Sequence, residues 1–141
     1  MSGANRFLDT NIFAYALDAR EGAKKSIAAE LIVTLIRNKQ AVVSYQVIQE
    51  FLNVAVRASI PGLGLDQGAS HLQVIFSKME IVSPSLKLYE EALALHAKYH
   101  FHWYDSLIVA AALEARCETL YTEDLQHGQI IDGLTIVNPF L

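Results

Sequence analysis

The sequence predicts one α/β domain over residues 1–141, with a central parallel sheet of about five strands and helices on both faces. Three observations favour this fold class. A length of 141 residues is typical of a single domain. The residues are 52% apolar and 18% charged, which is typical of a chain that packs a core. Short apolar segments alternate with longer segments of helical periodicity, and strands that are joined through helices pair in parallel.

The first half of the chain contains two strand patterns and four helix patterns. Apolar runs with aromatic or β-branched residues predict strands at residues 6–9 and 41–44. Apolar residues that recur three and four positions apart predict helices at residues 12–17, 24–37, 45–58 and 66–77. The segment 60–64 contains Pro and Gly and predicts a turn between helices.

The second half continues the alternation. Short apolar runs predict strands at residues 80–82, 119–121 and 134–137, and a turn is expected at residues 83–85. Helical spacing predicts helices at residues 86–99 and 106–115. The last of these helices is apolar on every side, so we expect it to lie at the centre of the fold.

Composition and charge limit the function. The formal net charge of −4 disfavours a general nucleic-acid coat, so any polyanion must meet a local basic patch or a bound cation. The longest apolar run, residues 107–113, is much shorter than the roughly 20 residues of a membrane span. The single cysteine, Cys117, lacks a disulfide partner, and the segment MSGANRF does not have the order of a secretion signal. We therefore expect a cytoplasmic protein without a membrane segment.

Two aspartates follow predicted strands. Asp9 ends the strand at residues 6–9, and Asp124 follows the strand at residues 119–121. Open parallel sheets bind ligands beyond the carboxyl ends of their strands, near the point where the strand order reverses. If the two strands are neighbours, both aspartates face one crevice. For each aspartate alone, a helix cap is an equally good interpretation.

Two further acids lie on predicted helices. Glu50 is at the middle of the polar face of the helix at residues 45–58, where a solvated surface glutamate is the ordinary interpretation. Asp105 comes directly before the apolar helix at residues 106–115. It is either a cap that complements the helix dipole or a carboxylate that the same dipole keeps ionised for a metal ion.

Four segments together resemble the ordered motifs of the PIN domain, and especially of its VapC-type toxins from toxin–antitoxin pairs. They are Phe7-Leu8-Asp9-Thr10-Asn11, Gln49-Glu50-Phe51, the run from Tyr104 to Ala110, and Leu120-Tyr121-Thr122-Glu123-Asp124. The resemblance implies that Asp9, Glu50, Asp105 and Asp124 form an acidic cluster, supported by Asn11 and Thr122. Many relatives carry a further acid where this chain has Gln126, so a second metal ion is expected to bind weakly or to be completed by the substrate.

Such a cluster has a clear chemical use. Neighbouring carboxylates repel one another, and a divalent cation removes the repulsion. Oxygen ligands without cysteine favour Mg²⁺ or Mn²⁺. We expect hydrolysis of an RNA phosphodiester by a water that the ion activates, with Asp9, Asp105 and Asp124 holding the ion and Glu50 orienting the water or holding a second ion. The resemblance also implies a 5′-phosphate product, a homodimer and a cognate antitoxin protein whose tail covers the crevice.

Other interpretations stay open. A catalytically silent PIN-like module would bind RNA or protein without cutting. A haloacid-dehalogenase-like phosphatase would carry a second aspartate at the position of Asn11, and a receiver domain would need a lysine near Thr122. His96 and His100 are spaced for one helix face, but zinc would need more ligands. Trp103 and Tyr104 are expected to be core or dimer contacts rather than base-stacking groups. The candidate phosphate contacts are Arg6, Lys24, Lys25, Arg57 and Lys98.

Overall fold

The computed structural model describes residues 4–141, and its strands form one six-stranded sheet. The strands are β1 (Arg6–Leu8), β2 (Ala41–Ser44), β3 (Glu80–Val82), β4 (Thr119–Tyr121), β5 (Ile130–Ile131) and β6 (Leu134–Val137). Their order is β3-β2-β1-β4-β6-β5, and every pair is parallel except β5 with β6. The five expected strands are confirmed. The sixth, β5, is a two-residue antiparallel edge strand that the sequence interpretation missed, so the sheet is mixed.

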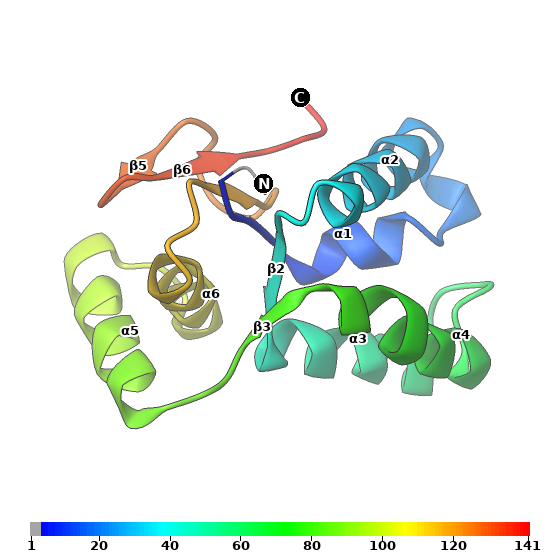
Figure 1. Ribbon diagram of the computed structural model, residues 1–141, viewed down its shortest axis with the longest axis horizontal. Coiled ribbons are helices and arrows are strands. Elements are labelled where there is room, and N and C mark those ends of the chain that lie inside the picture. The colour runs from blue at the N-terminus through cyan, green and yellow to red at the C-terminus, as the bar shows by residue number, and fades with distance from the viewer. Residues whose placement is uncertain (1–3) are drawn as a thin grey trace.

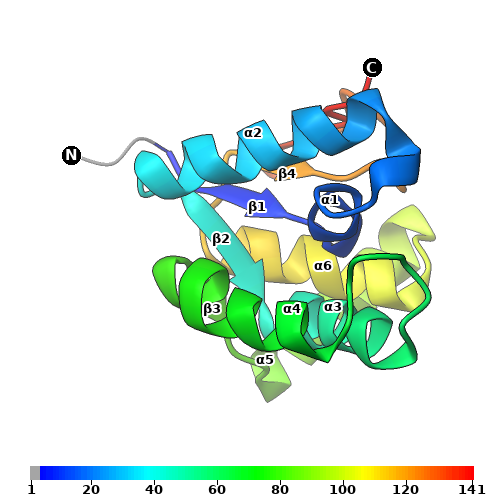
Figure 2. The same ribbon diagram turned by 90° about the vertical axis from the view of Figure 1, so that its right-hand side faces the viewer.

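Helices cover both faces of the sheet. They are α1 (Thr10–Tyr15), α2 (Ala23–Arg37), α3 (Tyr45–Arg57), α4 (Leu65–Ser70), α5 (Leu86–Tyr99) and α6 (Trp103–Glu114). A short 3₁₀ turn, Ala19–Glu21, precedes α2. Figure 2 shows α2 above β1 and β2 and α6 below them, while Figure 1 shows α5 outside α6. None of the helices within residues 4–141 has the length and apolar character that a membrane crossing requires.

The helix expected at residues 66–77 is wrong in its second half. After α4 the chain continues as a π-helical turn, His71–Ile75, and a 3₁₀ turn, Phe76–Lys78. The change of winding brings Phe76 into the core, with its ring centroid 4.9 Å from that of Phe13 and 5.5 Å from that of Phe51. Packing of this ring therefore outweighs the regular helical spacing.

This aromatic cluster fixes the two helices that carry acids. Phe13 is on α1 and Phe51 is on α3, and their ring centroids are 6.2 Å apart in an edge-on arrangement. All three rings of the cluster are at most 1% exposed. Because Asp9 directly precedes α1 and Glu50 directly precedes Phe51 in the chain, this packing holds their backbones rigidly relative to each other.

The sheet reverses its direction of growth at β1. The chain adds β2 and β3 on one side of β1 and then returns to add β4 on the other side. Leu8 pairs with Tyr121, and the backbone N–H of Asp9 donates to the carbonyl of Tyr121 over 3.1 Å. The expected adjacency of the two strands is confirmed, and the switch point where such sheets bind ligands lies beside Asp9.

The apolar helix α6 lies in the interior, as its composition predicts. Residues 106–112 are all buried, and Ser106 is the only polar residue among these seven. The Ser106 hydroxyl donates to the carbonyl of His102 over 3.2 Å, so the buried oxygen is paired within the helix.

Candidate active site

The four acids selected from the sequence line one crevice. The structure gathers Asp9, Glu50, Asp105 and Asp124 around a cavity of about 290 Å³ at the carboxyl end of β1 and β4. Thr10, Asn11, Gln46, Asn53 and Tyr104 complete most of the polar lining. Residues as far apart in the chain as Asp9 and Asp124 therefore meet at the switch point of the sheet.

Asp9 is the most deeply placed of the four. Only 7% of its surface is exposed. One carboxylate oxygen, Oδ1, accepts the backbone N–H of Thr10 over 2.7 Å, and the other, Oδ2, accepts the hydroxyl of Thr122 over 2.8 Å. The first bond makes Asp9 the N-cap of α1, so the capping interpretation is confirmed together with the position in the crevice.

Thr122 connects the two strand exits. Its side chain is 1% exposed. The hydroxyl donates to Asp9 and also accepts the backbone N–H of Asp124 over 3.1 Å. The expected supporting role of Thr122 thus has a geometric basis, because one hydroxyl sets the position of two acids.

Glu50 is half-buried rather than freely solvated. Its Oε1 accepts the hydroxyl of Thr10 over 2.8 Å, which directs the carboxylate toward the exit of β1. Thr10 is a residue of the site that the sequence interpretation missed. Its signal was present in the segment Asp9-Thr10-Asn11, where a hydroxyl follows directly on a strand-terminal aspartate.

Asp105 and Asp124 reach the crevice from opposite sides. Asp105 is in the first turn of α6, whose N-cap is His102, so it is not itself the cap. Asp124 lies in an irregular loop after β4, and the short helix that would make it a cap does not form. The amide of Asn11 approaches Asp124 with an Nδ2 to Oδ2 distance of 3.5 Å, which is a long contact at the limit of a hydrogen bond.

The crevice raises the pKa of its three aspartates. Burial raises the pKa of Asp9 from 3.8 to about 6 against the two bonds that stabilise its charge, and the charges of Asp124 and Glu50 add to the increase. Burial and then the charge of Asp124 raise the pKa of Asp105. Burial and then the charge of Glu123 raise the pKa of Asp124. The charge of His102 opposes the increase at Asp105 without cancelling it.

The donor set suits a hard divalent cation. The acids supply only oxygen ligands, and none of the residues that line the crevice within residues 4–141 is Lys, Arg or His. In the same part of the chain, no three His, Cys, Asp or Glu side chains are arranged as a ready-made metal site. The carboxylates thus surround a common space without converging on one point, an arrangement compatible with an ion that keeps several of its waters.

The loop that carries Asp124 is held from outside the crevice. Glu123 accepts the hydroxyl of Tyr15 and forms an ion pair with Lys24, with an Nζ to Oε2 distance of 3.0 Å. The Lys24 ammonium also lies 4.8 Å from the ring centroid of Tyr15 and 5.4 Å from that of Phe140. Adjacent acids therefore point in different directions, with Glu123 toward α1 and α2 and Asp124 toward the crevice.

Several other candidates take structural roles. Arg6 begins β1 at the end opposite the acids, donates to the Tyr121 hydroxyl over 2.7 Å and does not line the crevice in the described part of the chain. Lys24 is engaged by Glu123. Lys25, Arg57 and Lys98 do not line the crevice in the described part of the chain, and Lys98 lines a separate cavity behind α5.

The histidine pair does not share a helix face. His100 follows the end of α5 with φ of 62°, whereas His96 lies on the helix with Nδ1 2.6 Å from the carbonyl oxygen of Phe101. The spacing that suggested zinc is thus broken by a left-handed residue. Trp103 packs partly buried against the core as expected, but Tyr104 is 66% exposed and lines the crevice, so its expected place in the core is wrong.

The sequence pattern of the PIN domain matches residues 6–131. The chain belongs to the PIN domain family. No curated protein is similar enough in sequence to count as a match. The match includes all four acids of the crevice as well as Thr10, Asn11 and Thr122.

Solved structures share the fold of this PIN domain. A toxin–antitoxin complex from Klebsiella pneumoniae contains a chain that is 23% identical, with a TM-score of 0.70 over 96% of this chain and 98% of that one. VapBC2 from Rickettsia felis, bound to a DNA fragment from their promoter, is 24% identical with a TM-score of 0.65 over 93% and 96% of the two chains. VapC20 of Mycobacterium tuberculosis, a sarcin–ricin loop cleaving toxin, is 18% identical with a TM-score of 0.62 over 85% and 90%. At these identities the likeness establishes the fold.

Proposed function

We propose that this PIN domain is a metal-dependent endoribonuclease that acts as the toxin of a type II toxin–antitoxin pair. The observation that carries the proposal is the crevice at the switch point, where four carboxylates line one cavity and none of the lining residues in the described chain is cationic. Likeness to toxin chains along nearly the whole length supports the biological setting. The proposed substrate class is RNA, as it is for VapC20.

Each acid has a proposed role that its geometry supports. Asp9, Asp105 and Asp124 hold a Mg²⁺ or Mn²⁺ ion, directly or through water. When bound, the ion supplies Lewis acidity at the phosphate and lowers the pKa of a coordinated water. Thr10 holds Glu50 in place over 2.8 Å, and Glu50 orients the attacking water. Thr122 positions Asp9 and, through its bond to the backbone, Asp124.

The negative charge of the crevice explains why a cation is required. A phosphodiester is repelled by four carboxylates until a divalent ion reverses the local field. Attack by water is compatible with the 5′-phosphate product implied by the resemblance when the 3′-oxygen of the preceding ribose is the leaving group, and the ribose 2′-hydroxyl is then not the nucleophile. The proposal includes cytoplasmic action, a homodimer and a cognate antitoxin that covers this crevice. The toxin–antitoxin complexes among the structural relatives support the antitoxin.

A cleavage assay tests the proposal. Purified protein is incubated with a labelled pool of structured RNA and with Mg²⁺, Mn²⁺ or chelator, beside the variants Asp9→Asn and Asp105→Asn. Asp66→Asn is the matched control, since Asp66 is exposed on α4 and does not line the crevice. We expect metal-dependent cutting by wild type and by the control, and none by the two crevice variants.

The silent-module alternative predicts a different result. If wild type and both crevice variants show equal activity, or no RNA is cut with either ion, the enzymatic role is rejected. Retained RNA binding without cutting, measured by fluorescence anisotropy, would then favour a module that binds RNA only. The antitoxin is tested by co-expression with the neighbouring reading frame, where copurification and loss of cleavage are the expected results.

A further inference from the structure

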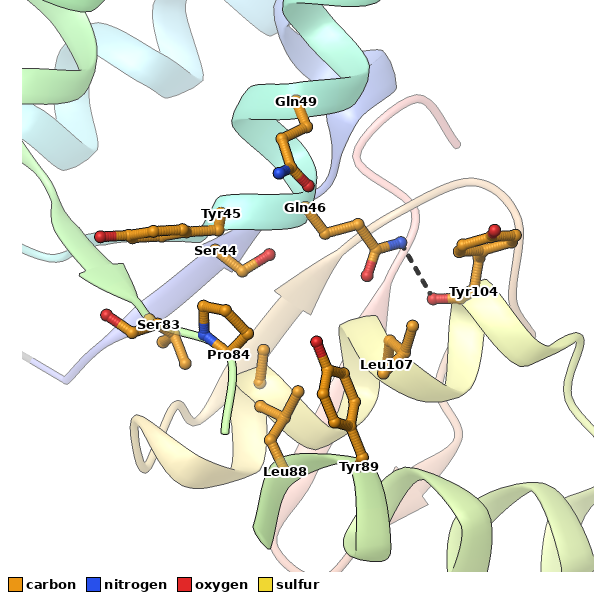
Figure 3. Close-up of a pocket in the computed structure, with 12 residues that line it drawn as sticks. Ser44, Tyr45, Gln46, Gln49, Ser83, Pro84, Leu88, Tyr89, Tyr104 and Leu107 are labelled. Carbon is orange, nitrogen blue, oxygen red and sulfur yellow. Dashed lines mark hydrogen bonds between the residues drawn. The ribbon is translucent and has the colours of Figure 1, made fainter. Parts of the chain in front are cut away.

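A second cavity adjoins the acidic crevice (Figure 3). Its volume is about 230 Å³, and it lies among the first turn of α3, the connection from β3 to α5, and the helices α5 and α6. Gln46 and Tyr104 line both this cavity and the crevice. The Gln46 amide donates its Nε2 hydrogen to the backbone carbonyl of Tyr104 over 3.2 Å. One hydrogen-bonded pair therefore stands between the second cavity and the four acids.

The lining of this cavity is neutral and rich in aromatic groups. Within residues 4–141 none of its lining residues is Asp, Glu, Lys, Arg or His. Tyr45, Tyr89 and Tyr104 are 49%, 42% and 66% exposed, and Pro84 forms part of the wall. The described lining therefore offers no cation to bind a phosphate and no anion to bind a basic side chain. The lining therefore complements a neutral, flat group that can stack on an aromatic face.

The cavity also presents polar atoms without partners. Figure 3 shows the side chains of Gln46 from α3 and Tyr89 from α5 entering the same space. In the described part of the chain, neither the Oε1 atom of Gln46 nor the Tyr89 hydroxyl forms a hydrogen bond with another residue. An apolar side chain in this space would leave both groups unpaired, whereas the edge of a nucleobase carries donors and acceptors for them.

We infer that this cavity receives one nucleobase of the RNA strand beside the bond that is cut, and so contributes to the sequence preference of cleavage. The inference rests on the proposed ribonuclease function. It names the specificity-determining residues as Gln46 and Tyr89, which are distinct from the four acids. Tyr104, at the boundary, stacks on the base while its neighbour Asp105 faces the phosphate.

The size of the cavity favours a single ring system. A volume of about 230 Å³ is below the roughly 300–1,000 Å³ that drug-sized ligands occupy. The rival occupant is an apolar side chain from a second copy of this chain, because exposed tyrosines also occur at protein interfaces. The unpaired amide and hydroxyl oxygens favour the base, and the experiment separates the two.

The first arm measures sequence preference. Wild type, Tyr89→Leu and the control Leu93→Ala cut a random-sequence RNA pool with Mn²⁺, and sequencing of the product ends gives the base frequencies around each cut. Leu93 is on the same helix as Tyr89, is 58% exposed and does not line the cavity. We expect Tyr89→Leu to lose about fivefold or more of the preference at one position beside the cut, the ratio that corresponds to one lost hydrogen bond of about 1 kcal/mol. Leu93→Ala keeps the wild-type pattern.

The second arm measures base binding without cleavage. The Asp9→Asn protein is titrated with adenosine, guanosine, cytidine and uridine, and the side-chain amide signals of Gln46 are followed by NMR. We expect saturable shifts of the Gln46 amide signals with at least one nucleoside. These shifts should be absent in the double variant that carries Tyr89→Leu together with Asp9→Asn. A Gln46 signal that does not move with any nucleoside would overturn the inference.

The remaining outcomes also discriminate. An unchanged preference in Tyr89→Leu overturns the base pocket. If a dimer of this variant also dissociates in sedimentation, the cavity is assigned to contact between copies. If wild type cuts no RNA, the proposed function fails by itself. In that case saturable nucleoside shifts at Gln46 still support the base pocket.

Discussion

Replacing Asp9 by asparagine is expected to stabilise the metal-free protein at neutral pH. Burial raises the pKa of Asp9 from 3.8 to about 6, so the folded state binds a proton more strongly than the unfolded state does. The contribution of Asp9 to the free energy of unfolding is therefore greatest below pH 3.8 and is lost as the pH rises through 6. The difference of about two pKa units corresponds to roughly 3 kcal/mol of destabilisation at pH 8.

The variant removes the charge but changes one hydrogen bond. The asparagine oxygen can still accept the backbone N–H of Thr10. Its NH₂ group is a donor, however, so it cannot accept the hydroxyl of Thr122 as the carboxylate does. A lost bond of this kind costs about 1 kcal/mol. The net expectation is a gain of about 2 kcal/mol at pH 8, which shrinks and reverses to a small loss at pH 4.

Urea unfolding in the presence of chelator, at several pH values from 4 to 8, measures this change. Asp66→Asn is the control. Because Asp66 is exposed, this substitution is expected to change the free energy of unfolding by no more than about 0.5 kcal/mol. A variant that is less stable than wild type at pH 8, or a stability difference that does not vary with pH, would refute the reasoning. Either result would mean that Asp9 is not destabilised by its own charge.

Three further outcomes are expected. A metal concentration of 100 times the dissociation constant should stabilise wild type by about 2.7 kcal/mol, and Asp9→Asn much less, as followed by thermal unfolding with Mg²⁺ or Mn²⁺. Thr10→Val should lower kcat/KM for RNA cleavage by about tenfold, because it frees a carboxylate that one hydrogen bond positions, while the control Thr34→Val, on the exposed side of α2, should not. Phe76→Ala should lower the free energy of unfolding by about 3–5 kcal/mol, since the ring is 1% exposed within the aromatic cluster.

Each of these three predictions can be contradicted by a specific result. Equal stabilisation of wild type and Asp9→Asn by the ion would separate Asp9 from metal binding. Full activity in Thr10→Val would show that Glu50 does not depend on its hydrogen bond. A loss in Phe76→Ala no larger than that in Leu65→Ala would contradict the packing argument, because Leu65 is 70% exposed.

Much of the fold could be predicted because its central elements carry strong local patterns. Residues 41–44 are all buried and include the β-branched Val42 and Val43, and residues 107–112 are all apolar, so period and composition agree with the structure. The strand β5 was missed because two residues give no period. Its signal was in the turn instead, where Asp132 and Gly133 have φ of 49° and 88°, the backbone that an Asp-Gly hairpin adopts.

The helix expected at residues 66–77 failed for a tertiary reason. Helical periodicity continues through the segment, but the packing of Phe76 against Phe13 and Phe51 favours π-helical and 3₁₀ turns over a regular α-helix. Gly68 also lets α4 approach α3 closely, since a Cβ atom there would lie 3.3 Å from that of Ala55. Neither contact is visible until distant segments are brought together.

The candidate site also has one part that could be predicted from the sequence and one part that could not. Strand exits could be located from the sequence, so Asp9 and Asp124 were placed at one edge by the rule for parallel sheets. The partnership of Thr10 with Glu50 could not, because forty positions separate them and only the packing of α1 against α3 aligns their side chains. The place of Arg6 outside the crevice could not be predicted either, because charge alone does not say which side chains face a cavity.

The central position of β1 has a consequence for the making of the protein. Chains leave the ribosome amino end first, so β1 emerges before β4. Its neighbour β4 is separated from it by more than a hundred residues of chain. The carbonyl of Tyr121 at the end of β4 and the hydroxyl of Thr122 directly after it fix Asp9. During synthesis the crevice therefore stays unassembled until residues 119–124 have emerged. Under the proposed ribonuclease function, a nascent chain is therefore inactive toward RNA until that point of its translation.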